Sequence, residues 1–263
     1  MSMAFNLLQQ AWRQGMQPLQ IPEGWSQGRA TFGGLVAAML YEKLASKAAQ
    51  GSLRSLSFSF VGPAVPGKVE MTASILRAGR SVTQVEGRAW QGESVVLAAQ
   101  ASFGEGRASS VVVSPAAAPA FPAPEQCQPM PKVPGVIPEF TQFFDYRIAA
   151  GALPFSGASS TQLGGWVRFH EAPEAVTVGH LLALIDAWPP AVLPMLAAPA
   201  PASSLTWTLE FIEPLPALSG QHWWQYLAEV EQAGDGYAVT QARLWDAEGR
   251  LVALSRQTVT VFG

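Results

Sequence analysis

The chain has 263 residues, of which 49% are hydrophobic and 13% charged, a composition typical of a globular protein with ample material for a core. The formal net charge is −3 and the Lys and Arg residues form no cluster, so a nucleic-acid partner is not expected. No apolar run of about 18 residues is free of proline and charge, and the first residues do not resemble a signal peptide. We therefore expect no membrane span and a soluble, cytoplasmic protein.

The first half of the chain contains one helix candidate followed by four strand candidates. The helix candidate is the apolar segment FGGLVAAMLYEKL at 32–44. The strand candidates alternate in polarity or are rich in Val, Thr, Trp and Phe, and glycine-bearing turns such as RAGRS separate them. They lie at 55–63, 68–79, 82–92 and 94–103.

A proline-rich segment follows. Eight of the 21 prolines lie between Pro115 and Pro138, which excludes a helix or a central strand and favours an extended, semi-rigid connector. The single cysteine, Cys127, lies in this segment with no His near it in sequence, so it is interpreted as a bystander thiol that forms no intramolecular disulfide. The sequence therefore predicts a first unit at 1–108, a linker at 109–139 and a second unit at 140–263.

The second half repeats the order of the first. Its helix candidate is VGHLLALIDAW at 178–188, and its strand candidates are at 204–214, 223–234, 237–249 and 251–262. Landmarks coincide, since FVGP matches FIEP, RAWQG matches RLWDAEG, and a Gly precedes a Gln by the same spacing in both halves. This pattern predicts an internal repeat of one unit, a helix and then a meander of antiparallel strands.

At this point the sequence resembles a known family. TFGGLVAAMLYEKL, SLSFSFVGPAVPG and LRAGRSVTQVEGRAWQGESVVLAAQASF resemble the N-terminal half of the bacterial acyl-CoA thioesterase II, or TesB-like, family. The segments from HLLALIDAW through SLTWTLEFIEP to VALSRQTV resemble its C-terminal half. The resemblance implies an α+β, double hot-dog fold, in which two repeats each have a long central helix wrapped by an antiparallel sheet.

The resemblance also implies a function. A member of the family hydrolyses an acyl-CoA thioester to free fatty acid and CoA, and no metal or redox cofactor is needed. Because the edges of such sheets tend to pair between subunits, we expect a homodimer or a larger homo-oligomer.

The resemblance places the active site in the second repeat. In the family an Asp on the central helix, a Thr at the start of the following strand and a Gln on the last strand orient a water against the thioester. These positions fall on Asp186, Ser204 and Gln257. Serine retains the hydroxyl of the family Thr but lacks β-branching, so its rotamer is less fixed. A shift of one residue would place Ser203 there, and a shift of two would place Thr206.

Asp186 also stands out on local chemistry. It lies near the C-terminal end of an apolar helix, where the helix dipole disfavours an anion. Trp188-Pro189-Pro190 terminates this helix. The dipole and the apolar neighbours should both raise its pKa and strengthen it as a base. The alternative is that Asp186 points to solvent or caps the following loop.

The repeat narrows the choice of functional residues. Gln100 occupies the position equivalent to Gln257, so a Gln alone does not mark a site. Tyr41 aligns with Asp186, and although Glu42 is adjacent, the first repeat is expected to be scaffold and pocket wall. His180, six positions before Asp186, points to another side of the helix and is not its expected partner.

The sequence lacks the motifs of metal sites and of α/β-type serine hydrolases. There is no HExxH, paired-cysteine or three-His arrangement for a metal, and no GxSxG. Gly33-Gly34 is too short for a nucleotide fingerprint and instead favours close approach between the helix start and a strand or a partner. Backbone N–H groups at this helix start are also candidate donors to a thioester oxygen. Three alternatives stay open: a silent acyl-thioester or lipid-binding protein on this fold, a hot-dog enoyl hydratase, whose Asp–His spacing is not evident, and a purely structural subunit.

Overall fold

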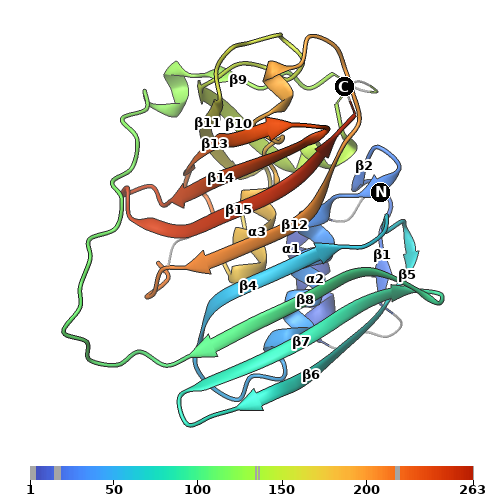
Figure 1. The fold of residues 1–263 in the computed structure, drawn as a ribbon, viewed down its shortest axis with the longest axis vertical. Coiled ribbons are helices and arrows are strands. Elements are labelled where there is room, and N and C mark those ends of the chain that lie inside the picture. Colours follow the sequence, from blue (N-terminus) through green and yellow to red (C-terminus); the bar gives the residue numbers. More distant parts are fainter. Residues whose placement is uncertain (1–3, 15–18, 134, 136, 217–219, 263) are drawn as a thin grey trace.

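The computed structural model describes residues 4–14, 19–133, 135, 137–216 and 220–262. Within them, the three α-helices are α1 (Phe5–Arg13), α2 (Gly33–Ala45) and α3 (Val178–Asp186) (Figure 1). The strands are β1 (Gln20–Ile21), β2 (Ser26–Gln27), β3 (Ala30–Thr31), β4 (Ser52–Phe60), β5 (Gly67–Lys68), β6 (Glu70–Ala78), β7 (Val82–Gln91), β8 (Ser94–Gly104), β9 (Gln128–Pro129), β10 (Phe144–Ala150), β11 (Gln162–Phe169), β12 (Ala202–Phe211), β13 (Trp224–Gly234), β14 (Tyr237–Trp245) and β15 (Leu251–Val261).

Most of these strands belong to one large antiparallel sheet with the order β6-β7-β8-β4-β12-β15-β14-β13-β11-β10-β9. The eight strands expected from the sequence are all present, with ends shifted by a few residues. The two halves meet where β4 pairs with β12, and at this junction Phe58 stacks on Trp207 with ring centroids 5.5 Å apart. The repeats therefore share a continuous sheet rather than forming two separate ones.

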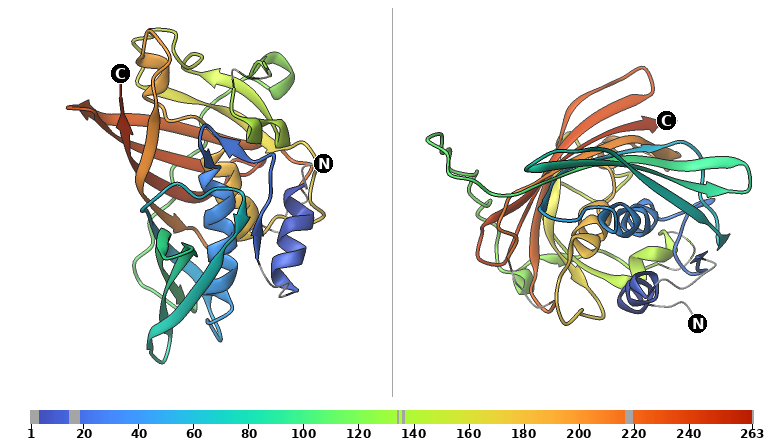
Figure 2. Two further views of the ribbon diagram at one scale, coloured as in Figure 1. Left: turned by 90° about the vertical axis from the view of Figure 1, so that its right-hand side faces the viewer. Right: turned by 90° about the horizontal axis from the view of Figure 1, so that it is seen from below.

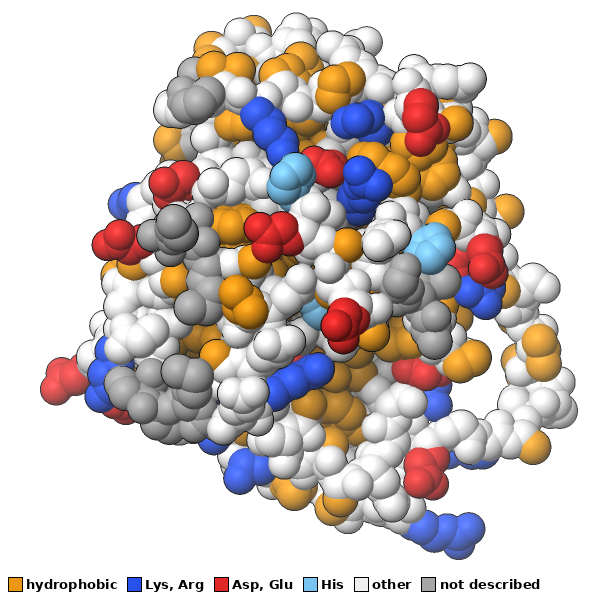
Figure 3. Space-filling view, turned by 180° about the vertical axis from the view of Figure 1, so that it is seen from behind, with side chains coloured by type: hydrophobic (Ala, Val, Ile, Leu, Met, Phe, Trp, Pro, Cys, Tyr) orange, Lys and Arg blue, Asp and Glu red, His pale blue; other side chains and the backbone are white. Residues whose placement is uncertain are grey.

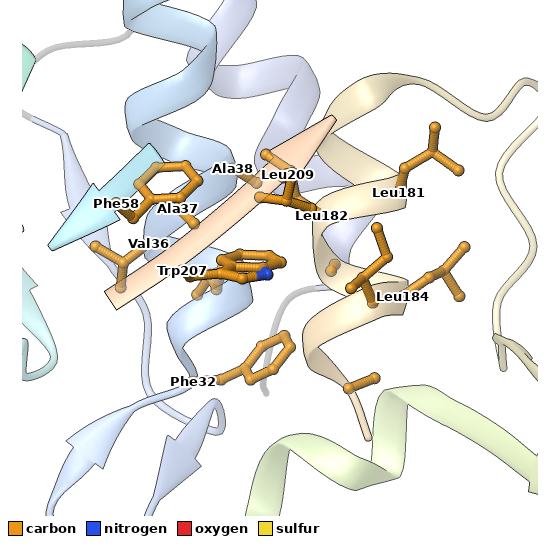
Figure 4. Close-up of a cluster of buried hydrophobic side chains, with 14 of the residues drawn as sticks. Phe32, Val36, Ala37, Ala38, Phe58, Leu181, Leu182, Leu184, Trp207 and Leu209 are labelled. Carbon is orange, nitrogen blue, oxygen red and sulfur yellow. The ribbon is translucent and has the colours of Figure 1, made fainter. Parts of the chain in front are cut away.

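Helices α2 and α3 lie side by side on the concave side of the sheet (Figure 2). Nine of the thirteen residues of α2 are buried, because the helix has sheet on one side and α3 on the other. Figure 4 shows the shared core, in which the Trp207 indole lies among side chains of both helices. Each fully buried Leu or Val in such a core contributes about 1.5–3 kcal/mol relative to an exposed one.

Helix α3, the central helix of the second half, is shorter than the sequence predicts. It ends at Asp186, two residues before Trp188, whereas the prediction extended it to 188. The two prolines that follow Trp188 explain the early end, because a residue before proline avoids the helical region. With nine residues against thirteen in α2, α3 is a short helix, so "long central helix" describes the first half better than the second.

Helix α1 was not expected from the sequence. It packs on α2 and α3, and its Phe5 is buried against Phe169, His180 and Trp25. The residue before it, Ala4, provides no side-chain cap, so the usual signal for a helix start is missing.

The proline-rich segment starts as an exposed loop and ends at the sheet. Val111, Val112 and Val113 are at least 76% exposed. Further on, the indole N–H groups of Trp245 and Trp166 donate hydrogen bonds to the carbonyls of Ala116 and Pro122, at 3.0 and 2.9 Å. Residues 128–129 then form the edge strand β9, a position that a proline tolerates.

The described helices include none that is long and apolar enough to cross a membrane. On the face shown in Figure 3, Lys and Arg side chains are interspersed with Asp and Glu side chains. No single sign of charge dominates that view.

Candidate active site

Asp186 lies at the last position of α3, directly against the start of α2. A Cβ atom added at Gly33 would lie 3.0 Å from Asp186 Oδ2, and one added at Gly34 would lie 3.1 Å from Asp186 Cβ. The close approach expected to a strand is made at Gly33, where the added Cβ would lie 3.1 Å from Phe60 of β4, and the approach to Asp186 of α3 was not expected. The surroundings of Asp186 are built by both halves of the chain, since α2 belongs to the first and α3 to the second.

The position of Asp186 explains its electrostatics. Removal from water raises the pKa of the carboxyl group from 3.8 to about 7. Two hydrogen bonds oppose this shift, one from the side chain of Gln257 and one from the backbone N–H of Gly34. As a whole residue Asp186 is only half-buried, unlike its fully buried neighbours on α3. A carboxyl group in this state can exchange a proton near neutral pH.

Gln257 is the direct partner of Asp186. Its Nε2 donates a hydrogen bond to Asp186 Oδ1 at 2.9 Å. On β15 Gln257 pairs with Trp207 of β12, whose indole N–H donates to Ser255 at 2.8 Å and is fully buried. The neighbouring sheet residues therefore fix the position from which Gln257 reaches the carboxylate.

Gln100 does not occupy an equivalent position in space. It pairs with Ser57 on β4, while the buried Phe58 pairs with Ala99, so Gln100 lies on the outer face and is exposed. The landmark alignment is thus one residue out of phase in this strand. The reason is physical: because side chains alternate in a strand, a shift of one residue moves a side chain to the other face. The Gln at 257, unlike that at 100, is specific to the site.

Ser204 lies at the start of β12 on the same face as Gln257. It pairs with the buried Val259, and a bulge at Leu205 brings Ser204 and Trp207 to one side of the strand. Ser203 and Thr206 are exposed and pair with Thr260 and Thr258 on the other side. Of the three hydroxyl residues considered, the register therefore selects Ser204. Within the described part of the chain its side chain hydrogen-bonds neither to Asp186 nor to Gln257.

Aromatic side chains close the site beyond the end of α3. The Tyr146 hydroxyl donates to the carbonyl of Ala187 at 3.0 Å, and Trp188 stacks on Tyr226 with ring centroids 5.4 Å apart. Burial raises the pKa of both tyrosines, and the charge of Asp186 raises it further. The sequence did not single out Tyr146 because its strand, β10, was not expected. Tyr226 lies on the expected strand β13, and nothing in its sequence pattern marked it.

His180 is engaged elsewhere. Its Nδ1 completes a capping box with Thr177 at the start of α3, and its Nε2 contacts Asn6 Oδ1 at 2.9 Å. Burial lowers the pKa of His180 to about 4, so the imidazole is neutral at pH 7. Nowhere among the described residues do three His, Cys, Asp or Glu side chains gather as a metal site would require.

Solved structures with the same arrangement have the hot-dog fold. A conserved protein with a hot-dog fold from Alicyclobacillus acidocaldarius superposes with a TM-score of 0.81 at 23% identity, covering 93% of this chain and 92% of that one. The acyl-CoA thioesterase II TesB2 of Mycobacterium marinum gives 0.71 at 23%, covering 88% of each chain. The tesB protein of Mycobacterium avium subsp. paratuberculosis gives 0.73 at 17%, covering 93% and 91%. At these identities the likeness establishes the fold.

Family profiles go further than the fold. The profile of the acyl-CoA thioesterase C-terminal domain matches residues 124–261, and that of the acyl-CoA thioesterase N-terminal domain matches residues 21–104. Among curated proteins, the comparison found no match. The class of protein is therefore a thioester hydrolase on a hot-dog fold. The chain belongs to the TesB-like acyl-CoA thioesterase family.

Proposed function

We propose that this protein hydrolyses acyl-CoA to a free fatty acid and CoA, with Asp186 as the base that activates water. The observation that supports it most directly is the desolvated carboxylate of Asp186, with a pKa of about 7 and a hydrogen bond from Gln257. A base whose pKa lies close to the working pH is both ionised and basic enough to accept a proton.

The proposed reaction balances without any added cofactor. Asp186 accepts a proton from water while the water oxygen attacks the thioester carbonyl carbon. The tetrahedral intermediate then expels the CoA thiolate, and the proton held by Asp186 passes to that sulfur. Gln257 donates one N–H to Asp186, which leaves its carbonyl oxygen and second N–H for the water. Ser204 supplies a hydroxyl from the same face of the sheet, two residues along the strands, where a water can bridge the gap.

The direct test measures thiol release from short, medium and long acyl-CoA substrates. Asp186→Asn should lower turnover by about 10²–10⁴-fold, the contribution typical of a general base, while the fold is retained. Glu42→Gln is the matched control, because Glu42 is the acid near the end of α2 and is paired with Arg13 at 2.9 Å. Undiminished turnover in Asp186→Asn would remove Asp186 from the mechanism.

A second candidate function is binding of an acyl thioester without hydrolysis. The observation in its favour is that, within the described residues, the Ser204 hydroxyl forms no hydrogen bond with Asp186 or Gln257. Saturable binding of acyl-CoA with no release of thiol at any chain length would favour this function over hydrolysis.

The division of the chain into two repeats and its oligomeric state belong to the same proposal. We infer a double hot-dog divided into 1–108, a linker at 109–139, and 140–263, which the two profile matches at 21–104 and 124–261 support. The outer strand β6 exposes Ile75 and Leu76, at 48% and 52%, which supports a homo-oligomer formed through this edge. The cytoplasmic location stays a prediction from the sequence.

A further inference from the structure

Helices α2 and α3 each contribute residues at both ends of the helix pair. At one end, the last turn of α3 supplies Asp186, the start of α2 supplies Gly33, and the end of β4 supplies Phe60, 3.1 Å from a Cβ placed on Gly33. At the other end the roles are exchanged. There the last turns of α2 supply Tyr41, the start of α3 supplies Val178, and the turn after β12 supplies Glu213.

That second end carries an open groove of about 410 Å³, within the range of small-molecule sites. Its lining is part apolar and part polar. It comes from the elements that correspond to those around Asp186: the end of α2, the start of β4, the end of β8, the start of α3 and the turn after β12. The apolar side chains include Ala45, Leu53, Phe103, Val178 and Leu215.

One polar side chain in the groove lacks a partner. Tyr41 is 9% exposed and lines the groove, and within the described residues its hydroxyl makes no hydrogen bond. Burial raises the pKa of Tyr41 well above its usual value, so the hydroxyl keeps its proton and can donate. The hydroxyl has no acceptor in the described chain and faces the groove, so it can donate to a ligand bound there.

Glu42, the acid next to Tyr41, is held in an ion pair. Glu42 lies near the start of α3, 3.5 Å from a Cβ placed on Gly179, much as Asp186 lies at the start of α2. However, Arg13 of α1 binds Glu42 through two hydrogen bonds of 2.9 and 3.0 Å, and Gln9 donates to Glu42 at 2.7 Å. Gln9 also donates to Thr177 at 2.8 Å, so this side chain of α1 links the Glu42 carboxylate to the start of α3. Glu42 is therefore ion-paired rather than free to activate water.

We propose that this groove is a second binding site, which takes the acyl chain and thioester of an intact acyl-CoA and does not hydrolyse it. The choice of ligand class rests on the proposed function. The apolar walls accept the chain, and the Tyr41 hydroxyl donates to the thioester carbonyl. The Glu213 carboxylate lines the same groove and repels a free fatty-acid anion, so a neutral thioester is favoured over the product.

The test counts binding sites with a non-hydrolysable thioether analogue of a medium-chain acyl-CoA, by calorimetry on the full chain. The wild type should bind two analogues per chain. Ala45→Phe, which fills the groove, should bind one, whereas Ala49→Phe, on an exposed residue outside the lining, should still bind two. Tyr41→Phe removes only the hydroxyl and should weaken the second site about three- to tenfold. Circular dichroism and melting curves establish that each variant is folded.

The outcomes separate this inference from the proposed function. One site per chain in the wild type, or two sites that Ala45→Phe leaves intact, would overturn the second site. So would a second site that takes free fatty acid or CoA alone in place of the analogue. Thiol release reports on the proposed function independently, because two bound analogues with no hydrolysis would retain the second site and reject the hydrolase.

Discussion

Asp186 shows how one residue combines opposing influences. Burial disfavours its charge, whereas the Gln257 amide and the Gly34 N–H favour it, and burial prevails to leave the pKa at about 7. The residue therefore changes protonation state within the physiological pH range. Two predictions follow from this value, one for activity and one for stability.

The first is a pH dependence of hydrolysis. Only ionised Asp186 can accept a proton, so kcat/KM should rise about tenfold per pH unit below pH 7 and become constant above it. Gln257→Leu removes a hydrogen bond that lowers this pKa, so the midpoint of the residual activity should move to higher pH. Rate profiles between pH 5 and 9 would measure both midpoints. A profile flat from pH 5 to 9 would contradict the assignment of Asp186 as the base.

The second prediction concerns the free energy of unfolding. The folded-state pKa of Asp186 lies above its ordinary value of 3.8, so the stability linked to its proton is fully present below about pH 4 and is lost as pH rises through 7. Asp186→Asn cannot ionise, so at pH 8 it should be more stable than the wild type by about 1–4 kcal/mol. The gain should vanish towards pH 4. Urea unfolding of both proteins at pH 4.5 and pH 8 measures the difference, and an equal gain at both pH values would argue against a titrating Asp186.

At the scale of elements, the contact between α2 and α3 depends on the glycines at the start of α2. A Cβ on Gly34 would lie 2.5 Å from Cζ of Phe32, which is stacked on Phe140 with ring centroids 4.1 Å apart and has little room to move. Gly34→Ala should therefore displace α2 from Asp186, destabilise the fold by about 1–3 kcal/mol and lower kcat. Gly106→Ala is the matched control, because the nearest atom to its Cβ would be 3.8 Å away. Thermal melts and initial rates of both variants test the expectation, and equal behaviour of the two would refute it.

The elements also show what the sequence could and could not predict. Alternation and glycine turns located the eight long strands, and the apolar runs located α2 and α3. Strand β11 escaped notice because it contains Gly164 and Gly165, which are poor strand formers in isolation. Its neighbour β10 was not predicted either. The site was less predictable, since the contact of Asp186 with Gly34 joins residues far apart in the chain. The inward direction of Gln257 against the outward direction of Gln100 depends on register, which a single sequence does not specify.

At the scale of the whole molecule, the two halves are one structural unit. Strand β4 pairs with β12 across the centre of the sheet, and α2 packs along α3 beneath it. Each half alone would expose an unpaired strand edge and one side of an apolar helix, a state prone to aggregation. The proposed active site also needs Gly34 from the first half and Asp186 from the second.

A cut in the linker should therefore leave a working enzyme. Val111 to Val113 are exposed, so a protease site in place of residues 110–113 should be cleaved without disturbing the sheet. We expect the nicked fragments to co-elute in size-exclusion chromatography, to retain most of the acyl-CoA hydrolysis and to unfold in a single transition, because the sheet junction and the helix pair persist. The same two segments expressed separately should be insoluble or inactive until mixed. Dissociation of the nicked fragments into two folded halves would mean that the halves are independent domains, contrary to the shared sheet and core described above.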